Sequence, residues 1–280
     1  MSAPGSVAVI GLGLIGGSVA RGLSALGLDV MGYDSNPAHL DAAVAEGIVT
    51  ERLLAGLEGA TEADTVLIAV YGDSAVDVLH LLAPNAGRIG LIMDVGSTKQ
   101  TIVSTAESLK LASRFVGAHP FAGDHRSGWS ASRFDLFESQ TVFLCPASGT
   151  SRATLALAHA FWESLGAKPL EMDAAAHDEL LALTSHLPHV VSTALALALA
   201  DDGIVRCQLG RGGRDVTRLA GGSPDMWTAI LLDNSTAIEQ AVSGVERQLA
   251  QFRELLRTGD RPGLSARLET ARDWIGPAER

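Results

Sequence analysis

His119 is the side chain of this chain that is best placed to transfer a proton. It follows the apolar residues 115–118 and lies in the segment GAHPFAG, predicted as a short turn bounded by glycine. An imidazole changes its charge near neutral pH, so a histidine between a buried strand and a turn can accept or donate a proton. The simpler alternative is that His119 ends a strand and hydrogen-bonds only to backbone.

Ser97 and a pair of histidines are the next candidates for chemistry. Ser97 follows the apolar run 89–94, where it could be a helix N-cap, could hydrogen-bond an active-site group, or could do both. His186 and His189, in TSHLPH, are three residues apart and therefore fall on neighbouring faces of one helix. A metal would need a further ligand; His119 could serve, but nothing else in the pattern requires zinc, and we expect no metal. One histidine of the pair is more simply a core residue bonded to backbone.

The segment 210–222 is rich in glycine and contains three arginines, Arg211, Arg214 and Arg218. The chain has 21 basic residues and a formal net charge of −11, so an anionic substrate needs basic residues of its own nearby. Guanidinium groups bind carboxylates through two parallel hydrogen bonds. We interpret this segment as a clamp for an anion, with a solvated basic loop as the alternative.

The N-terminal part of the chain has the pattern of a dinucleotide-binding unit. An apolar strand at 7–10 is followed directly by GLGLIG, then by a helix over about 15–26 and by a second strand at 29–33 that ends at Asp34. A glycine-rich turn between a strand and a helix places the helix N-terminus against the phosphates of a nucleotide. The alternative is a glycine-rich turn in a similar fold that binds no dinucleotide.

Each residue of this unit has an expected role. Gly11 permits the tight turn, Gly13 lets the backbone approach the pyrophosphate, and Gly16 lets the helix pack closely on the strand. Asp34 can bind the ribose hydroxyls and would repel a 2′-phosphate, so NAD is favoured over NADP. The candidates for cofactor contact are Gly11, Gly13, Leu14, Ile15, Gly16, Asp34, Val70 and Ser97.

Strand and helix signals alternate up to about residue 146 and then change character. Further buried strands are expected at 63–70, 89–94, 115–118 and 141–144, and helices at 36–47 and 73–82. After the stretch PASGTS, alanine and leucine dominate, and the expected elements are helices at 151–166, 173–200, 223–257 and 261–274 with one short strand at 168–172. The predicted fold class is therefore α/β: a Rossmann-type, mostly parallel sheet domain at 1–150, then an all-helical dimerisation domain at 151–280.

The predicted helix at 173–200 is apolar almost all round, which indicates a buried helix. Pro188 should kink it and aim His186 or His189 into a cleft. One small domain offers too little cover for such a helix, so we expect a homodimer built on these helices. The run 180–200 approaches membrane length, but its histidines, its proline and the Asp201-Asp202 pair favour a buried helix over a membrane span.

Composition narrows the class of protein. The 280 residues are 47% apolar and 19% charged, as in a folded chain of one or two domains. The net charge of −11 argues against a nucleic-acid-binding surface. Cys145 and Cys207 are far apart and in no metal-type spacing, which argues against a disulfide framework and fits a reducing cytoplasm.

Seven motifs, in order along almost the whole chain, resemble the prephenate/arogenate dehydrogenase family of tyrosine biosynthesis. They are GLGLIGGS, YDSNP, DVGSTK, GAHPFAG, TSHLPH, RDVTR and PDMW. The later motifs are far more specific than the glycine fingerprint. The resemblance implies an NAD-binding N-terminal domain, a helical dimerisation domain and an active site between them.

The resemblance also implies residue roles. His119 corresponds to the catalytic histidine, Ser97 to its serine partner and Arg218 to a carboxylate-binding arginine. Further residues expected near the substrate are His189 on the kinked helix, Arg214 and Trp227. The chain departs from the family after the histidine turn, where it has Asp124-His125 instead of a small polar residue and Glu. We hypothesise that Asp124 could pair with an ammonium group of the substrate.

The expected activity is the NAD-dependent oxidative decarboxylation of prephenate to 4-hydroxyphenylpyruvate. Arogenate, or both substrates as in a cyclohexadienyl dehydrogenase, are the alternatives. A 3-hydroxyacid dehydrogenase would use a lysine base from a helix, but the only lysines are Lys99, Lys110 and Lys168. A non-catalytic NAD-binding protein would keep the glycines and Asp34 without needing His119, Ser97 and Arg218 together.

Overall fold

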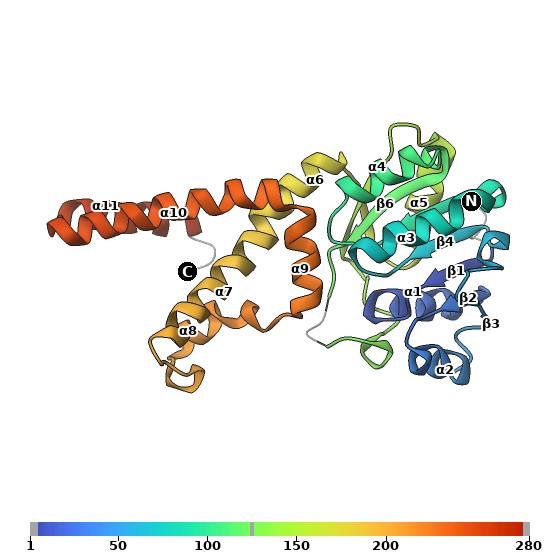
Figure 1. Ribbon diagram of the computed structural model, residues 1–280, viewed down its shortest axis with the longest axis horizontal. Helices are drawn as coiled ribbons and strands as arrows, with labels where there is room; N and C mark the ends of the chain where they lie inside the picture. The colour runs from blue at the N-terminus through green and yellow to red at the C-terminus, as the bar shows by residue number, and fades with distance from the viewer. Residues whose placement is uncertain (1–4, 124–125, 277–280) are drawn as a thin grey trace.

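The computed structural model describes residues 5–123 and 126–276 and shows a sheet domain followed by an elongated helical domain (Figure 1). The sheet has eight strands in the order β3-β2-β1-β4-β5-β6-β7-β8. The strands are β1 Val7–Ile10, β2 Val30–Tyr33, β3 Glu51–Arg52, β4 Thr65–Ile68, β5 Leu91–Asp94, β6 Phe115–Pro120, β7 Thr141–Pro146 and β8 Lys168–Glu171. Neighbouring strands are parallel except for the antiparallel pair β6 and β7. The predicted fold class is confirmed.

Helices cover both faces of this sheet. One face carries α1 Leu14–Ala25, α2 Pro37–Ala45 and α5 Arg152–Ser164, and the other carries α3 Gly72–Leu82 and α4 Gln100–Ser108. Side chains alternate between the two layers along β1: Val7 and Val9 belong to one core, and Ala8 and Ile10 belong to the other. A strand buried on both faces has to be apolar throughout, which explains why the central strands are continuous apolar runs.

The strand that carries His119 is longer than predicted. β6 extends through Pro120, and His119 lies opposite Phe143 of the antiparallel strand β7. The prediction that His119 lies on a turn is therefore wrong. The reason is a long-range one: pairing with β7 keeps the backbone extended across a Gly/Pro segment that would favour a turn by itself.

The sheet unit continues beyond residue 150. Helix α5 buries Phe161 and Trp162 in the core under the sheet, and β8 pairs with β7 at the sheet edge. The predicted boundary at residues 150 and 151 therefore falls inside the packed layer. We propose that the domains divide between β8 and the next helix, at residues 172–173.

Up to residue 276, the second domain contains helices and no strand. The helices are α6 Ala174–Leu181, a π-helical turn Ala182–His186, α7 Leu187–Asp201, the 3₁₀ turn η6 Arg206–Gln208, α8 Arg211–Val216, the 3₁₀ turn η7 Arg218–Gly221, α9 Pro224–Asp233, α10 Ser235–Thr258 and α11 Arg261–Ile275. Figure 1 shows α6 and α7 as one long rod, with α10 and α11 projecting away from the sheet domain. The predicted helix at 223–257 is in fact two helices, α9 and α10, which meet at Asn234.

The long helix 174–201 is not buried within one chain; the prediction is a buried helix whose cover is completed by a second copy of the chain. Only 28% of its most apolar window is covered, although its length and composition would suffice to cross a membrane. Leu183 and Leu197 are about 60% exposed, and α7 buries only His189 and Ser192. The helix therefore directs polar side chains inward and leucines outward, so its cover has to come from outside this chain.

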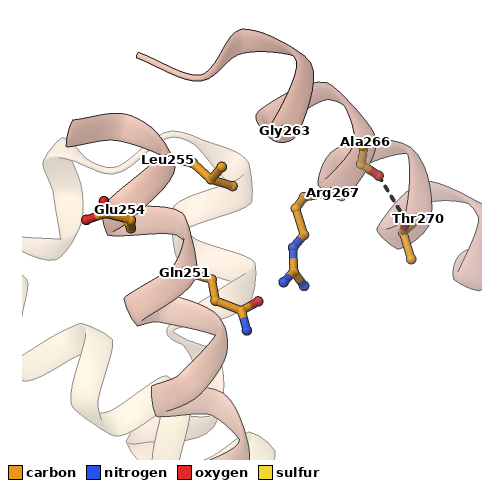
Figure 2. A pocket seen from close by; sticks show the side chains of 7 residues that line it. All are labelled: Gln251, Glu254, Leu255, Gly263, Ala266, Arg267 and Thr270. Atoms are coloured by element: carbon orange, nitrogen blue, oxygen red, sulfur yellow. Dashed lines mark hydrogen bonds between the residues drawn. The ribbon is translucent and has the colours of Figure 1, made fainter. Parts of the chain in front are cut away.

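A groove of about 520 Å³ lies between α10 and α11 (Figure 2). Its lining residues are Gln251, Glu254, Leu255, Gly263, Ala266, Arg267 and Thr270. The groove belongs to the projecting hairpin and contains none of the residues predicted to do chemistry. Those of the predicted residues that the structure describes lie on other elements of the two domains.

Candidate active site

The glycine-rich turn after β1 has the shape that a dinucleotide requires. Gly11 has φ +97°, and a Cβ there would lie 2.4 Å from the carbonyl oxygen of Ala69. A Cβ on Gly16 would lie 1.9 Å from the carbonyl oxygen of Gly11. Around Gly13, by contrast, a Cβ would meet no described atom within 4 Å, so the N-terminus of α1 opens onto free space. An anion can approach these backbone N–H groups closely, and the residues fit the pyrophosphate of a dinucleotide.

Asp34 is held rigidly at the end of β2. Its Oδ2 accepts a hydrogen bond from Leu12 N at 2.7 Å, and its Oδ1 accepts one from Asn36 N at 2.7 Å. The ring of His39 lies 3.3 Å from the same carboxylate. Each carboxylate oxygen retains acceptor capacity for a ribose hydroxyl. Of the other predicted contacts, Leu14, Ile15 and Val70 are half-buried around this turn.

His119 is buried beside the helical domain. Its Nδ1 lies 2.9 Å from Nε2 of His177, which is on α6. Burial holds the pKa of His119 well below its ordinary range, and protonation of His177 or His186 and the ammonium group of Lys99 lower it further. His119 is therefore neutral at physiological pH, the state that a proton acceptor needs.

Asp178, next to His177 on α6, joins the two domains. Its Oδ1 is 2.8 Å from His177 Nδ1 and accepts a 2.8 Å bond from Lys99 N, while its Oδ2 accepts a 2.9 Å bond from Gln100 N. Burial raises the pKa of Asp178, but the hydrogen bonds from His177 and from the two backbone groups outweigh burial and hold this pKa below its usual range. An ionised carboxylate from the helical domain thus caps α4 of the sheet domain.

The structure decides one of the two roles predicted for Ser97. Helix α4 has Lys99 at its N-cap with no side-chain cap, so the N-cap role predicted as one option for Ser97 is wrong. Among the described residues, no hydrogen bond joins Ser97 to His119, whose partner is His177. Ser97 is half-buried just after β5, the strand next to β6.

A buried ion pair lies under the site. Lys99 is fully buried and pairs with Asp94, the last residue of β5. Gly96 N donates to the same carboxylate at 2.8 Å. Burial raises the pKa of Asp94, and the ammonium group of Lys99 counteracts this. A Cβ on Gly117 of β6 would lie 3.2 Å from Lys99 Cδ, which places the lysine stem against the strand that carries His119.

The histidines of the long helix line the other side of the junction. His189 stacks on Trp227 of α9, with ring centroids 3.6 Å apart and an interplanar angle of 11°. His186 is fully buried, and Asn234 Nδ2 lies 3.3 Å from its Nδ1. Burial lowers the pKa of His186 to about 4. A Cβ on Gly222 would lie 2.5 Å from Trp227 Nε1, so the stack fills the space around this glycine.

The arginines lie in short helices instead of a loop. Arg214 is in α8, Arg218 begins η7, and both are exposed. Backbone of this segment is tied to the long helix, since Ala220 N donates to Ser192 Oγ at 3.2 Å. No ion pair involves Arg218 within residues 5–123 and 126–276. Asp124 lies outside the described residues.

Three buried residues of the site were not predicted: His177, Asp178 and Asn234. They form no spaced motif, and their partners are on other elements. Asn234 Nδ2 donates to the carbonyl oxygen of Asp178 at 2.7 Å, which links the α9–α10 junction to the His119 network. The clue in the sequence is a His-Asp pair near the start of the first helix after the sheet.

A dinucleotide turn on one side and a buried neutral histidine on the other form the arrangement of a two-domain nucleotide-dependent dehydrogenase. Residues 19–171 match the family described as prephenate dehydrogenase, nucleotide-binding domain, and residues 173–270 match prephenate dehydrogenase, dimerization domain. The chain belongs to the prephenate dehydrogenase family. The predicted family and an oxidoreductase that uses NAD are confirmed.

Individual relatives agree with this assignment. The prephenate dehydrogenase of Bacillus subtilis (strain 168) is 32% identical over 278 residues, which cover 96% of this chain and 75% of the relative. The crystal structure of prephenate dehydrogenase from A. aeolicus with hydroxyphenyl propionate and NAD+ is 29% identical, with a TM-score of 0.88 and 98% of each chain covered. The structure of Synechocystis arogenate dehydrogenase is 28% identical, with a TM-score of 0.82 and coverage of 95% and 97%.

Proposed function

We propose that this protein catalyses the NAD-dependent oxidative decarboxylation of prephenate to 4-hydroxyphenylpyruvate. The observation that carries the proposal is His119, a buried neutral base at the junction between the dinucleotide-binding domain and the helical domain. Membership of the prephenate dehydrogenase family supports the choice of substrate.

The chain's own residues supply placement and proton transfer. The turn from Gly11 to Gly16 binds the pyrophosphate, and Asp34 binds the adenosine ribose. A bound NAD would supply the hydride acceptor for the hydroxyl-bearing ring carbon. His119 takes the hydroxyl proton, and the resulting ring carbonyl accepts, through the ring, the electron pair of the carbon–carboxylate bond as CO2 leaves. The ring becomes aromatic, and the product oxygen regains a proton that His119 can return.

The substrate would be held mainly from the helical side. Arg218 and Arg214 are surface guanidinium groups on an otherwise acidic chain, and we propose that Arg218 pairs with a substrate carboxylate. The stacked pair His189 and Trp227 offers an aromatic wall for the ring. Ser97, at the end of the strand next to β6, is proposed to contact the nicotinamide side of the site.

Prephenate-dependent formation of NADH tests this function. In His119→Asn we expect kcat to fall by about 10²–10⁴-fold while NAD binding persists, because general base assistance is lost and the glycine turn is untouched. The matched control is His159→Asn, since His159 lies on α5 and pairs with Glu171 of β8. A fully active His119→Asn enzyme would refute the proposal.

Arogenate is the second candidate substrate, supported by the similarity to the Synechocystis enzyme. Arogenate carries an ammonium group where prephenate carries a keto group, and Asp124 is proposed to pair with that ammonium. Comparing kcat/KM for both substrates in wild type and Asp124→Asn tests the idea. An unchanged ratio would show that Asp124 does not select the substrate.

The assembly is proposed to be a homodimer through the helical domain, with no nucleic-acid or membrane partner. The exposed leucines of the long helix and the match to a dimerization domain support this. The free cysteines Cys145 and Cys207 and the use of NAD support a cytoplasmic location. A monomeric mass by light scattering at micromolar concentration would contradict the dimer.

A further inference from the structure

We infer that His177 and Asp178 are positioning residues that fix which nitrogen of His119 carries the proton, and so which nitrogen can act as base. The inference rests on the proposed function in one respect only, namely that the proposed function assigns His119 as the base. It begins from the chain of contacts that runs from Asp178 through His177 to His119.

Asp178 determines the first link of this chain. Its two oxygens face three groups: the ring nitrogen Nδ1 of His177 and the backbone N–H groups of Lys99 and Gln100. An ionised carboxylate can only accept hydrogen bonds. Nδ1 of His177 must therefore carry a hydrogen and donate it to Asp178.

His177 determines the second link. Its side chain is completely buried, and its ring contacts the ring of His119, on which the positive charge of Lys99 also acts. A second positive charge here would be costly, and the charge of Asp178 is already stabilised by two backbone donors at a helix N-terminus. The inference therefore assigns His177 a single ring hydrogen, on Nδ1, which leaves a lone pair at Nε2.

The tautomer of His119 follows from these two links. Nε2 of His177 accepts, so Nδ1 of His119, 2.9 Å away, must donate. The hydrogen of a neutral imidazole is then used, and Nε2 of His119 holds the lone pair that can receive a substrate proton. In the opposite tautomer that nitrogen would carry a hydrogen and could not act as a base.

The two positioning residues belong to a different domain from the base. His119 is on β6 of the sheet domain, whereas His177 and Asp178 are on α6 of the helical domain. Asp178 also caps α4, and Asn234 binds its carbonyl oxygen, so α6 is held in place from both sides. The active tautomer is therefore a property of the docked domains and not of the sheet domain alone.

Nitrogen NMR of isotope-labelled histidine in the intact enzyme tests the tautomer directly, without substrate. The chain has eight histidines, and the His119→Asn variant identifies the signals of His119. We expect Nδ1 of His119 to be protonated and Nε2 to be unprotonated at neutral pH. The reverse assignment would overturn the inference, whether or not the proposed substrate is turned over.

Paired variants at His177 provide a second test. His177→Gln keeps a strong acceptor near the Nε2 position, whereas His177→Met has similar bulk and only a weakly accepting thioether sulfur. We expect kcat of the Met variant to be about 10²–10³-fold below that of the wild type, and kcat of the Gln variant to be about tenfold or more above that of the Met variant. KM for NAD should be unchanged in both variants. His159→Gln and His159→Met on the sheet surface are the matched controls. Equal activity of the Met variant and the wild type would overturn the inference.

If both His177 variants failed to fold, the NMR measurement on the wild-type enzyme would still decide. If the enzyme turned over neither prephenate nor arogenate, only the proposed function would be refuted, because the tautomer is read without substrate. A wild-type His119 with a hydrogen on Nε2, by contrast, would refute the positioning role alone.

Discussion

The sheet domain completes its own core, and the helical domain does not. Strands β1, β4 and β5 are buried throughout, and α1 contributes seven buried residues to the layers around them. In the helical domain α10 buries only Ile238 and Ala241 along 24 residues, and α11 buries none. The difference indicates that the sheet domain buries its core within one chain, whereas the apolar faces of the helical domain need a second copy of the chain to cover them.

The long helix makes the contrast sharpest. A helix in a self-contained domain turns its apolar side inward, but α7 buries His189 and Ser192 while Leu195 and Leu197 remain accessible. Its inner side faces the proposed active site, and its outer side carries the exposed leucines that we propose are covered in the dimer.

The largest effect is expected from charges on the outer side of this helix. Leu183→Glu together with Leu197→Glu should abolish the dimer and lower the melting temperature by on the order of 10 °C, because the helical domain loses its cover. Light scattering and thermal unfolding measure both. The matched control is Leu54→Glu, at a similarly exposed leucine of the sheet domain. An equal loss of dimer and of melting temperature in this control would contradict the proposed difference between the two domains.

The next effect concerns the cofactor turn of the sheet domain. Gly11→Ala places a Cβ 2.4 Å from a carbonyl oxygen at φ +97° and should weaken NAD binding by about 10²-fold. Cofactor titration by fluorescence measures this. In Gly87→Ala the new Cβ meets no described atom within 4 Å, so binding should be unchanged. Normal NAD affinity in Gly11→Ala would contradict the proposal that the turn after β1 binds the dinucleotide.

A smaller effect is expected in the aromatic wall of the helical domain. Gly222→Ala brings a Cβ within 2.5 Å of Trp227 Nε1 and 3.0 Å of His189 Cε1. KM for prephenate should rise by about tenfold with KM for NAD unchanged, since only the substrate side is disturbed. Gly221→Ala, with open space around it, is the neighbouring control. Equal kinetic constants for the two variants would show that the stacked His189 and Trp227 are not part of the substrate site.

The smallest effect is a pH dependence of the helical domain. The pKa of His186 is lowered from its ordinary 6.5 to about 4 by burial, so the unfolded chain binds a proton more readily than the folded one. Stability from this group is complete above about pH 6.5 and is lost as pH falls toward 4. Asp178, His177 and His189 also influence this group.

Thermal unfolding between pH 7 and pH 4 measures this loss. The melting temperature of the helical domain should fall by a few degrees more in wild type than in His186→Asn, because the variant lacks the titrating ring. His159→Asn, on the sheet surface, should retain the full acid sensitivity. Identical pH profiles for wild type and His186→Asn would exclude His186 as the cause.

Features with a local signal could be predicted from the sequence. The turn at Gly11 and Gly16 is set by backbone geometry, and Asn36 caps α2 ahead of Pro37 as expected. The fold class follows from the alternation of apolar runs and helices. The motif containing His119 identified the histidine that the structure buries at the domain junction.

Features that depend on distant partners could not be predicted. The extension of β6 needs β7, and the helix break at Asn234 serves contacts to Asp178 and His186 on another helix. His177 has no local pattern, because its role is defined only by the histidine that it faces across the domain junction. The roles predicted for Ser97, Arg214 and Arg218 remain predictions, since the protein alone shows no contact between them and a substrate.

The π-helical turn at 182–186 sets the directions in which side chains before and after it point, so that the continuous helix 174–201 contacts both the sheet domain and α9. In an uninterrupted α-helix, Asp178 and His189 would be only about 20° apart around the axis and would face the same way. A π turn accommodates roughly one extra residue and rotates the helix beyond it by about 100°. Asp178 can then reach the sheet domain while His189 meets Trp227 on α9. Adding or removing one residue in this turn would rotate α7 relative to α6, and Asp178 and His189 could then no longer both reach their present partners.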